Sequence, residues 1–302
     1  MRIFKTIFIL FFCYLITSCS FIKTGYNNAP KLTLWWLNDY FNLTSTQIHT
    51  IEPALNDLHN WHRKQQLPEI IMLLNTMQSA FASDKVTADA VCEQVQAFKS
   101  NLFTLQTESI PIILALAPTL TEKQMARFQK KLDKRAQKWK SQWWQESEND
   151  QLLARLEKSE EFLEKVYGNL SFEQLTLLKT QLAQANFNPA TSFNEILRRN
   201  TDAVAILIAL QNESKSTYHK NDSQSLQLVE QYLEIKTKIV QAGFDRMQKS
   251  PEFTYFQYAN QMTKHNCEAI ANLHATTSIE QKLNAKKWLK NYIVQLSALQ
   301  TK

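Results

Sequence analysis

The scarcity of glycine is the feature that most constrains the fold of this 302-residue chain. The chain contains 3 Gly and 7 Pro, whereas the tight turns and corners of β-sandwiches, barrels and nucleotide-binding sheets depend on glycine. Leu, Gln, Lys, Ala and Glu, which are good helix formers, are frequent instead. The composition therefore predicts an all-α fold, in a chain long enough to bury a sizeable core.

Helix-forming segments follow one another along most of the chain. Neither Gly nor Pro occurs between Thr121 and Tyr167, which predicts a long central helix, in one or two parts, that ends at Gly168. Further helices are expected near 171–186, 192–213, 223–248, 251–275 and 278–299. We expect about eight to ten helices in antiparallel hairpins, in a helical domain over 31–302 with Gly168 as the candidate point of subdivision.

Residues 1–18 have the parts of an export signal. Arg2 and Lys5 form a positive segment, and an apolar segment follows at 6–15; at about ten residues it is shorter than the ~20 needed to span a membrane. The residues before Cys19 resemble a bacterial lipobox. This resemblance implies cleavage before Cys19 and attachment of fatty acyl chains, such as palmitate, to that cysteine. The alternatives are a secretory signal cut elsewhere and an uncleaved anchor.

Lipidation of Cys19 would hold the mature chain in the envelope of a Gram-negative bacterium. Several acyl chains anchor stably, because each buried CH₂ contributes about 0.8 kcal/mol. Ser20 implies, by the same resemblance, sorting to the outer membrane, facing the periplasm. Residues 19–30 are expected to form a lipidated tether. The segment 31–41 is apolar on nearly every face, so its aromatic side chains either plug one end of the core or lie at lipid headgroups.

Two cysteines remain beyond Cys19, Cys92 and Cys267, both in segments expected to be helical. An oxidising compartment would allow them to form a disulfide. The bond would close a loop of about 175 residues and, by loop-closure entropy, stabilise the fold by roughly 4–5 kcal/mol. The alternative is a pair of buried free thiols, which behave as small apolar side chains.

A five-residue motif, Leu-Thr-x-x-Gln or Leu-Ser-x-x-Gln, precedes three of the expected helices. It has the spacing of a capping box, in which a hydroxyl and a glutamine side chain bond each other's backbone N–H. Helix capping alone accounts for the motif, at roughly 1 kcal/mol for each cap. The three pairs are Thr44 with Gln47, Thr121 with Gln124, and Ser171 with Gln174.

Two resemblances accompany this motif. The stretches "YNNAPKLTLWWLNDYFNLTSTQ" at 26–47 and "NWHRKQQLP" at 60–68 are similar to a family of uncharacterised Gram-negative helical lipoproteins, a domain of unknown function. That resemblance implies a helical fold and an envelope location, and no catalytic residues. The motif alone also resembles periplasmic stress chaperones of the Spy and CpxP type, which implies a basic, partly apolar surface that holds unfolded clients.

The stretch "RFQKKLDKRAQKWKSQWW" at 127–144 is a basic amphipathic helix. Such a helix can bind anionic lipid or acidic and unfolded protein; the alternative is a core helix with a solvated lysine face. The formal charge of +6 is too small to indicate nucleic acid as a partner. The candidate partner-binding face, which we call the basic face, consists of Arg127, Lys131, Lys134, Lys138, Trp139 and Trp143.

Sequence signatures of catalysis are absent. The chain has no G-x-S-x-G, no H-E-x-x-H and no phosphate-binding glycine loop, and the pair His59 and His62 has no clear third metal ligand. We expect no catalytic residues, no metal and no cofactor. The sequence predicts a non-catalytic envelope lipoprotein that acts as an interaction or scaffold protein, bound to the membrane by its lipid and to another envelope protein. A chaperone-like binder of unfolded periplasmic clients is the alternative.

Overall fold

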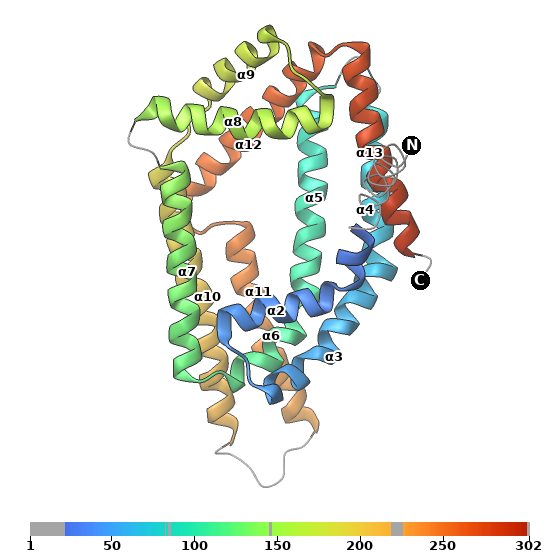
Figure 1. The fold of residues 1–302 in the computed structure, drawn as a ribbon. Coiled ribbons are helices and arrows are strands. Elements are labelled where there is room, and N and C mark those ends of the chain that lie inside the picture. Colours follow the sequence, from blue (N-terminus) through green and yellow to red (C-terminus); the bar gives the residue numbers. More distant parts are fainter. Residues whose placement is uncertain (1–21, 82, 84–85, 145–146, 219–225, 301–302) are drawn as a thin grey trace, which may run out of the picture.

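The computed structural model describes residues 22–81, 83, 86–144, 147–218 and 226–300, and it leaves the side chains of 215–218 and 226–228 undescribed. These residues form helices and no strand (Figure 1), so the predicted all-α class is confirmed. Cys19 and the expected signal peptide at 1–18 lie outside the described residues.

The helices follow one another with short connections. Residues 22–27 are helical and lead into the first labelled helix. A single π-helical turn, η1, joins α3 to α4, and a 3₁₀ turn, η2, follows α6. In chain order the elements are α2 (Ala29–Phe41), α3 (Ser45–Trp61), η1 (His62–Gln66), α4 (Leu67–Phe81), α5 (Ala88–Glu108), α6 (Ile110–Leu116), η2 (Ala117–Thr119), α7 (Glu122–Trp143), α8 (Glu148–Tyr167), α9 (Phe172–Gln184), α10 (Pro189–Tyr218), α11 (Leu226–Gln248), α12 (Phe253–Ala275) and α13 (Ile279–Gln300).

The expected long element at 121–167 is two separate helices, α7 and α8. Trp144 leaves the helical region, with φ −103° and ψ 69°. Ser147 then begins α8 as its N-cap, because its hydroxyl accepts a hydrogen bond from the backbone N–H of Asp150 at 3.1 Å. The break uses neither Gly nor Pro. Gly168 ends α8 with a φ of 83°, in the left-handed region that glycine adopts without strain.

The expected tether at 19–30 is folded from residue 22 onward. Residues 22–27 are helical, and Pro30 is buried in the first turn of α2. Side-chain bonds fix this segment to the end of α3 and to η1: the Tyr26 hydroxyl lies 2.9 Å from His62 Nδ1, and Arg63 donates to the Asn27 side chain at 2.8 Å. The segment is therefore part of the folded body.

Segments far apart in the chain pack against one another. Consecutive helices contact in the pairs α2/α3, α8/α9 and α10/α11, whereas α4/α13, α5/α12 and α7/α10 join distant parts of the sequence. In Figure 1, α7 and α10 run side by side along one flank and α4 and α13 along the other. These contacts connect the parts of the chain on either side of Gly168.

The buried apolar side chains form three clusters. The first joins α2, α3, α6 and α7, with Phe41 stacked on Phe128 at a centroid distance of 4.7 Å. The second joins α6, η2, α10 and α11. The third joins α8, α9, α12 and α13 around Tyr167. The helices are thus held by several smaller cores, each built from both near and distant parts of the chain.

Helix α5 connects the parts of the chain that contain these clusters, and none of its own residues is buried. In the described part of the chain, only the run Ala88–Thr119, which begins with α5, has the length and composition of a membrane-crossing helix. The carbonyl of Asn101 in α5 accepts a hydrogen bond from the buried side chain of Gln66, and a disulfide joins α5 to α12. We interpret α5 as a helix that links parts of the folded body.

Candidate functional site

The three motifs of the Leu-Thr/Ser-x-x-Gln type form capping boxes at the starts of α3, α7 and α9. Thr44, Thr121 and Ser171 each accept a hydrogen bond from the backbone N–H three residues later, at 3.2, 3.3 and 3.3 Å. Each glutamine side-chain oxygen accepts a hydrogen bond from the backbone N–H of its N-cap residue, at 2.9 to 3.0 Å. The motif therefore has a structural role in this fold.

The glutamines of the capping boxes also pair with one another across helices. Gln47 and Gln124, both buried, exchange side-chain amide hydrogen bonds of 3.1 and 2.8 Å. Gln174 exchanges bonds of 2.9 Å in both directions with Gln281 in α13. Each pair joins the start of one helix to the start of another, α3 to α7 and α9 to α13.

Gln281 belongs to a fourth capping box, which sequence reasoning missed. Its backbone N–H donates to Ser278 Oγ at 3.1 Å, and its side chain accepts from the Ser278 N–H at 2.9 Å. Thr277 precedes this box where the other three have leucine, so the apolar flanking residue that drew attention to those motifs is missing. The spacing Ser-x-x-Gln alone is the signal that could have revealed it.

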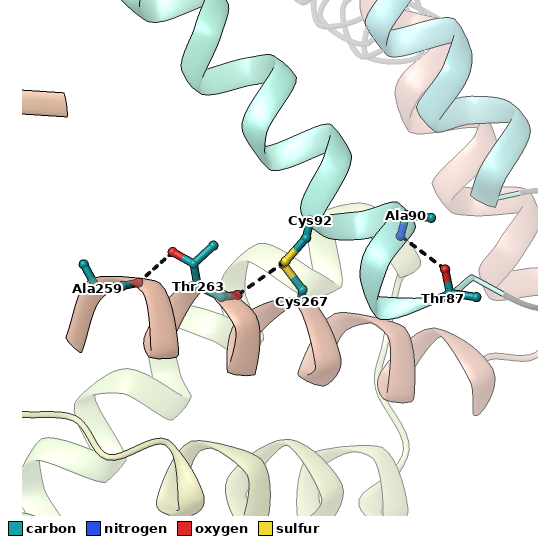
Figure 2. The surroundings of a disulfide bond; sticks show 6 residues. All are labelled: Thr87, Ala90, Cys92, Ala259, Thr263 and Cys267. Atoms are coloured by element: carbon teal, nitrogen blue, oxygen red, sulfur yellow. Dashed lines mark hydrogen bonds between the residues drawn. A yellow bond between two sulfur atoms is a disulfide. The ribbon is translucent and has the colours of Figure 1, made fainter. Parts of the chain in front are cut away.

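Cys92 of α5 and Cys267 of α12 form a disulfide, with an S–S distance of 2.07 Å. Figure 2 shows the bond crossing from the first turns of α5 to α12, beside the Thr87 cap of α5. Cys267 is 1% exposed. Closure of the 175-residue separation contributes about 5 kcal/mol by loop-closure entropy.

The basic face on α7 is only partly free. Arg127 donates two hydrogen bonds to the backbone carbonyl of Asp39 in α2, at 3.1 and 3.0 Å, and Lys131 forms an ion pair with the Asp39 carboxylate at 2.5 Å. These two cations therefore hold α2 on α7. Hydrogen bonding to Lys131 is the largest influence on the Asp39 carboxyl and lowers its pKa.

The rest of the basic face lies toward the end of α7. Lys134 and Lys138 are exposed, and Trp139 and Trp143 are half-buried. The Trp139 ring stacks on the buried ring of Phe193 in α10, with centroids 6.2 Å apart. The structure therefore separates the six expected residues into two that bind α2 and four around a partly open end of the helix.

The expected aromatic segment at 31–41 divides between core and surface. Tyr40 and Phe41 are buried in the first cluster. Leu32, Trp35 and Trp36 are exposed to 52%, 70% and 46%. Because positions 32, 35 and 36 fall on one side of a helix, α2 presents a patch of large apolar side chains to solvent, which we call the α2 patch.

A cavity of about 550 Å³ lies between α2, α3, α5 and α6, beside the α2 patch. Most of its wall is apolar. Trp36 contributes both to this wall and to the patch, so the patch lies at the margin of the cavity. Its apolar lining includes Pro30, Leu37, Leu55, Leu58, Leu105 and Ile112.

Tyr26, His59 and His62 form one polar part of the cavity wall, which we call the polar wall; Thr33, Gln106 and Ser109 line the cavity elsewhere. The Tyr26 ring lies 4.8 Å from the His59 ring, and its hydroxyl bonds His62. His59 Nε2 is buried and has no hydrogen-bond partner among the described residues. Burial, with the nearby Arg63 charge adding to it, lowers the pKa of His59 despite a hydrogen bond between the ring and the Tyr26 backbone. Burial likewise lowers the pKa of His62.

The π-helical turn η1 lies at this polar wall and carries His62 and Arg63. Pro68 follows in the first turn of α4, and a proline inside a continuous helix clashes with the carbonyl four residues earlier. A widened turn relieves that clash, and π-helical turns occur often at functional sites. The i, i+3 spacing of His59 and His62 suggests a metal site or local pairing, and the neighbouring Tyr26 could not be connected to them from spacing.

An ion cluster between α10 and α11 was also missed. The Glu195 carboxylate, 2% exposed, accepts hydrogen bonds from Arg198 Nε at 2.7 Å and Nη2 at 2.8 Å, from Arg199 at 2.7 Å and from Ser250 at 2.9 Å. Arg198 and Arg246 both reach Asp202, at 2.7 and 3.0 Å. The i+3, i+4 and i+7 spacing of Glu195, Arg198, Arg199 and Asp202 was the available signal. The cluster is satisfied internally, which indicates a structural role.

Among the described residues, no group of three or more His, Cys, Asp and Glu side chains is arranged to hold a metal ion.

Comparison with known proteins gives one match. A family model described as a family of unknown function, DUF6279, matches residues 39–236, which is more than half of the chain. No curated protein and no solved structure matches. The matched range includes the capping boxes of α3, α7 and α9, the basic face and the α10 residues of the ion cluster, and it begins after the α2 patch.

Proposed function

Because the chain belongs to the DUF6279 family, whose function is unknown, we propose its role from its own surfaces: a non-catalytic, lipid-anchored interaction protein of the bacterial envelope. In this role Cys19 carries the lipid. The folded body faces the periplasm from the outer membrane and binds another envelope component.

The α2 patch is the observation that carries this proposal. Trp35 is 70% exposed and is flanked by Leu32 and Trp36, which are 52% and 46% exposed. Exposed neighbouring apolar side chains on a folded protein mark protein or membrane contact sites, and tryptophan is enriched where a membrane meets water. The patch begins thirteen residues after Cys19. Because residues 22–27 and α2 are helical, with a rise of about 1.5 Å per residue, the patch would stay close to a membrane-anchored Cys19.

The disulfide supports the envelope location. Bonds such as Cys92–Cys267 persist in oxidising compartments, the bacterial periplasm among them, and are rare in the cytosol. The lipobox resemblance before Cys19 supports the anchor.

The experiment has two arms, so the anchor and the interaction are judged separately. First, the intact mass of the mature chain is measured, with Cys19→Ser as its comparison. We expect acyl chains on Cys19 and loss of membrane attachment in Cys19→Ser; a chain that starts elsewhere and carries no lipid would overturn the anchor.

Second, a photoreactive amino acid is placed at Trp35 and, as a matched control, at Phe253, which is 69% exposed at the start of α12. We expect crosslinks to one discrete envelope component from position 35 and none from position 253. Equal labelling from both positions would refute the α2 patch as an interaction site.

A chaperone-like role for the basic face is the second candidate. Exposed Lys134 and Lys138 beside half-buried Trp139 and Trp143 favour it, because such a surface attracts acidic and apolar segments of unfolded protein. The double charge reversal Lys134→Glu, Lys138→Glu should abolish suppression of client aggregation while leaving the urea midpoint unchanged. Unchanged suppression would exclude this role for the basic face.

A further inference from the structure

The cavity between α2, α3, α5 and α6 has the features of a ligand pocket. Its volume of about 550 Å³ lies within the ~300–1,000 Å³ of pockets that enclose small ligands, and such pockets combine mostly apolar walls with a few convergent polar groups. Here the apolar part is made mainly by leucine, isoleucine and proline side chains. The aromatic and imidazole polar groups gather on one wall, at Tyr26, His59 and His62, and Thr33, Gln106 and Ser109 add polar side chains elsewhere.

We propose that this cavity binds a long-chain fatty acid, with the acyl chain against the apolar wall and the carboxyl group at His59. The site does not depend on lipidation of Cys19 and shares only Trp36 with the α2 patch, so this proposal and the proposed function can fail independently.

The apolar wall specifies an acyl chain. Leu37 of α2, Leu55 of α3, and Leu105 and Ile112 near the end of α5 and in α6 line the cavity together, and they offer no hydrogen bond to a polar ligand body. A flexible hydrocarbon chain can follow an irregular apolar surface of this kind and gains from each methylene that leaves water.

The unpartnered nitrogen of His59 specifies the polar end of the ligand. Nε2 is buried and has no partner among the described residues, and a buried polar atom without a hydrogen bond destabilises the protein. A carboxyl group satisfies this atom in either state of the ring, since the acid donates to neutral imidazole and the carboxylate accepts from imidazolium. The positive charge of Arg63, 5.3 Å from the centroid of the Tyr26 ring, favours the carboxylate.

The test is photolabelling of the full chain in isolated envelope membranes with a C16 fatty acid that carries a mid-chain diazirine. The labelled residues are then mapped by mass spectrometry. We expect labels on cavity residues within 29–37, 55–62 and 105–113. Labels confined to Leu32 and Trp35, the patch residues that do not line the cavity, would overturn the proposal, because they would report adsorption to the α2 patch.

Two matched variants test the cavity itself. Ala29→Trp fills it, because Ala29 lines the cavity, and labelling should fall at least tenfold. Leu32→Trp introduces the same side chain at an exposed position of the same helix, and labelling should stay within twofold of the unmodified chain. Equal effects of the two variants would refute binding in the cavity.

Two further arms test the head group and the source of the acyl chain. In His59→Leu, labelling by the acid should fall about tenfold relative to labelling by its methyl ester, the loss expected for one hydrogen bond to a charged group; an unchanged ratio would refute the carboxyl assignment. Because Cys19→Ser is expected to leave the membrane, it is purified in detergent and labelled beside the purified unmodified chain, and its labelling should be unchanged. A several-fold rise would show that the protein's own lipid had filled the cavity, and would overturn the assignment to a free fatty acid.

Discussion

Replacing Glu195 with glutamine tests whether the ion cluster between α10 and α11 stabilises the fold. The Glu195 side chain is 2% exposed and accepts bonds from two arginines and a serine. Glutamine keeps the size of the side chain but turns one acceptor oxygen into an NH₂ donor, which cannot accept from arginine. Arg198, whose side chain is 18% exposed, then loses one of the two carboxylates that it contacts at 2.7 Å.

The expected cost is about 3 kcal/mol in the free energy of unfolding. Removing one partner of a buried ion pair destabilises by about 3–5 kcal/mol. We expect the lower end because solvent screens part of the contribution of Arg199, which is 39% exposed, and because Asp202 still pairs with Arg198. With an m-value of about 3 kcal/mol/M, the midpoint of urea unfolding should fall by about 1 M.

Glu234→Gln provides the matched control. Glu234 and Lys238 form an ion pair of 2.6 Å at the same i, i+4 spacing, but their side chains are 62% and 73% exposed. The same chemical change should therefore leave the midpoint of urea unfolding nearly unchanged. If both variants shift the urea midpoint equally, or if Glu195→Gln costs less than about 1 kcal/mol, burial does not strengthen this cluster and the reasoning fails.

The cost of Glu195→Gln should also depend on pH. Burial alone would raise the pKa of Glu195, but hydrogen bonds from Arg198, Arg199 and Ser250 outweigh it and hold the pKa below its usual value. Because its pKa is lower in the folded state, Glu195 stabilises the folded protein at pH values above its unfolded-state pKa of about 4.3. This stabilisation is lost as the pH falls through the folded-state pKa. The difference in the free energy of unfolding between the unmodified protein and Glu195→Gln should therefore become smaller below about pH 4.

Three further predictions use the same unfolding assay. Gln124→Ala removes both a capping bond and the buried pair with Gln47, so it should lower the free energy of unfolding by about 2 kcal/mol. Thr121→Ala removes the cap alone and should cost about 1 kcal/mol. Equal costs for the two variants would refute a contribution from the Gln47–Gln124 pair. The double variant Cys92→Ser, Cys267→Ser should lose up to about 5 kcal/mol, and reduction of the unmodified protein should reproduce its midpoint. Burial lowers the pKa values of His59 and His62. The free energy of unfolding should therefore reach its full value above about pH 6.5 and decrease as the pH falls through the folded-state pKa values. Replacing both histidines with Gln should make the free energy of unfolding less dependent on pH in this range.

Much of the helical layout could be predicted from the sequence. The scarcity of glycine indicates the fold class, and capping signals such as Thr44 and Thr121 mark helix starts to within a residue. The element at 121–167 was expected as one helix or two, but the position of its break at Trp144 was not predicted, which shows the limit of reading only Gly and Pro. A chain can leave the helix at an ordinary residue when a strong cap such as Ser147 begins the next helix.

The pairing of helices was beyond reach of the sequence. An amphipathic stripe indicates which face of a helix is buried but does not identify its partner. The contacts of α4 with α13 and of α7 with α10 therefore follow from no local pattern. The same limit hid the polar wall of the cavity, because Tyr26 precedes His59 and His62 by more than thirty residues and meets them only after α2 and α3 fold together.

The Cys92–Cys267 disulfide limits how far the chain can be extended by force. Pulled at its two ends, the oxidised protein extends only through the segments before Cys92 and after Cys267, because the 175-residue span between them stays closed. At about 3.4 Å per residue, this removes roughly 600 Å of contour length. More than half of the sequence is therefore protected from stretching when the oxidised chain is under tension.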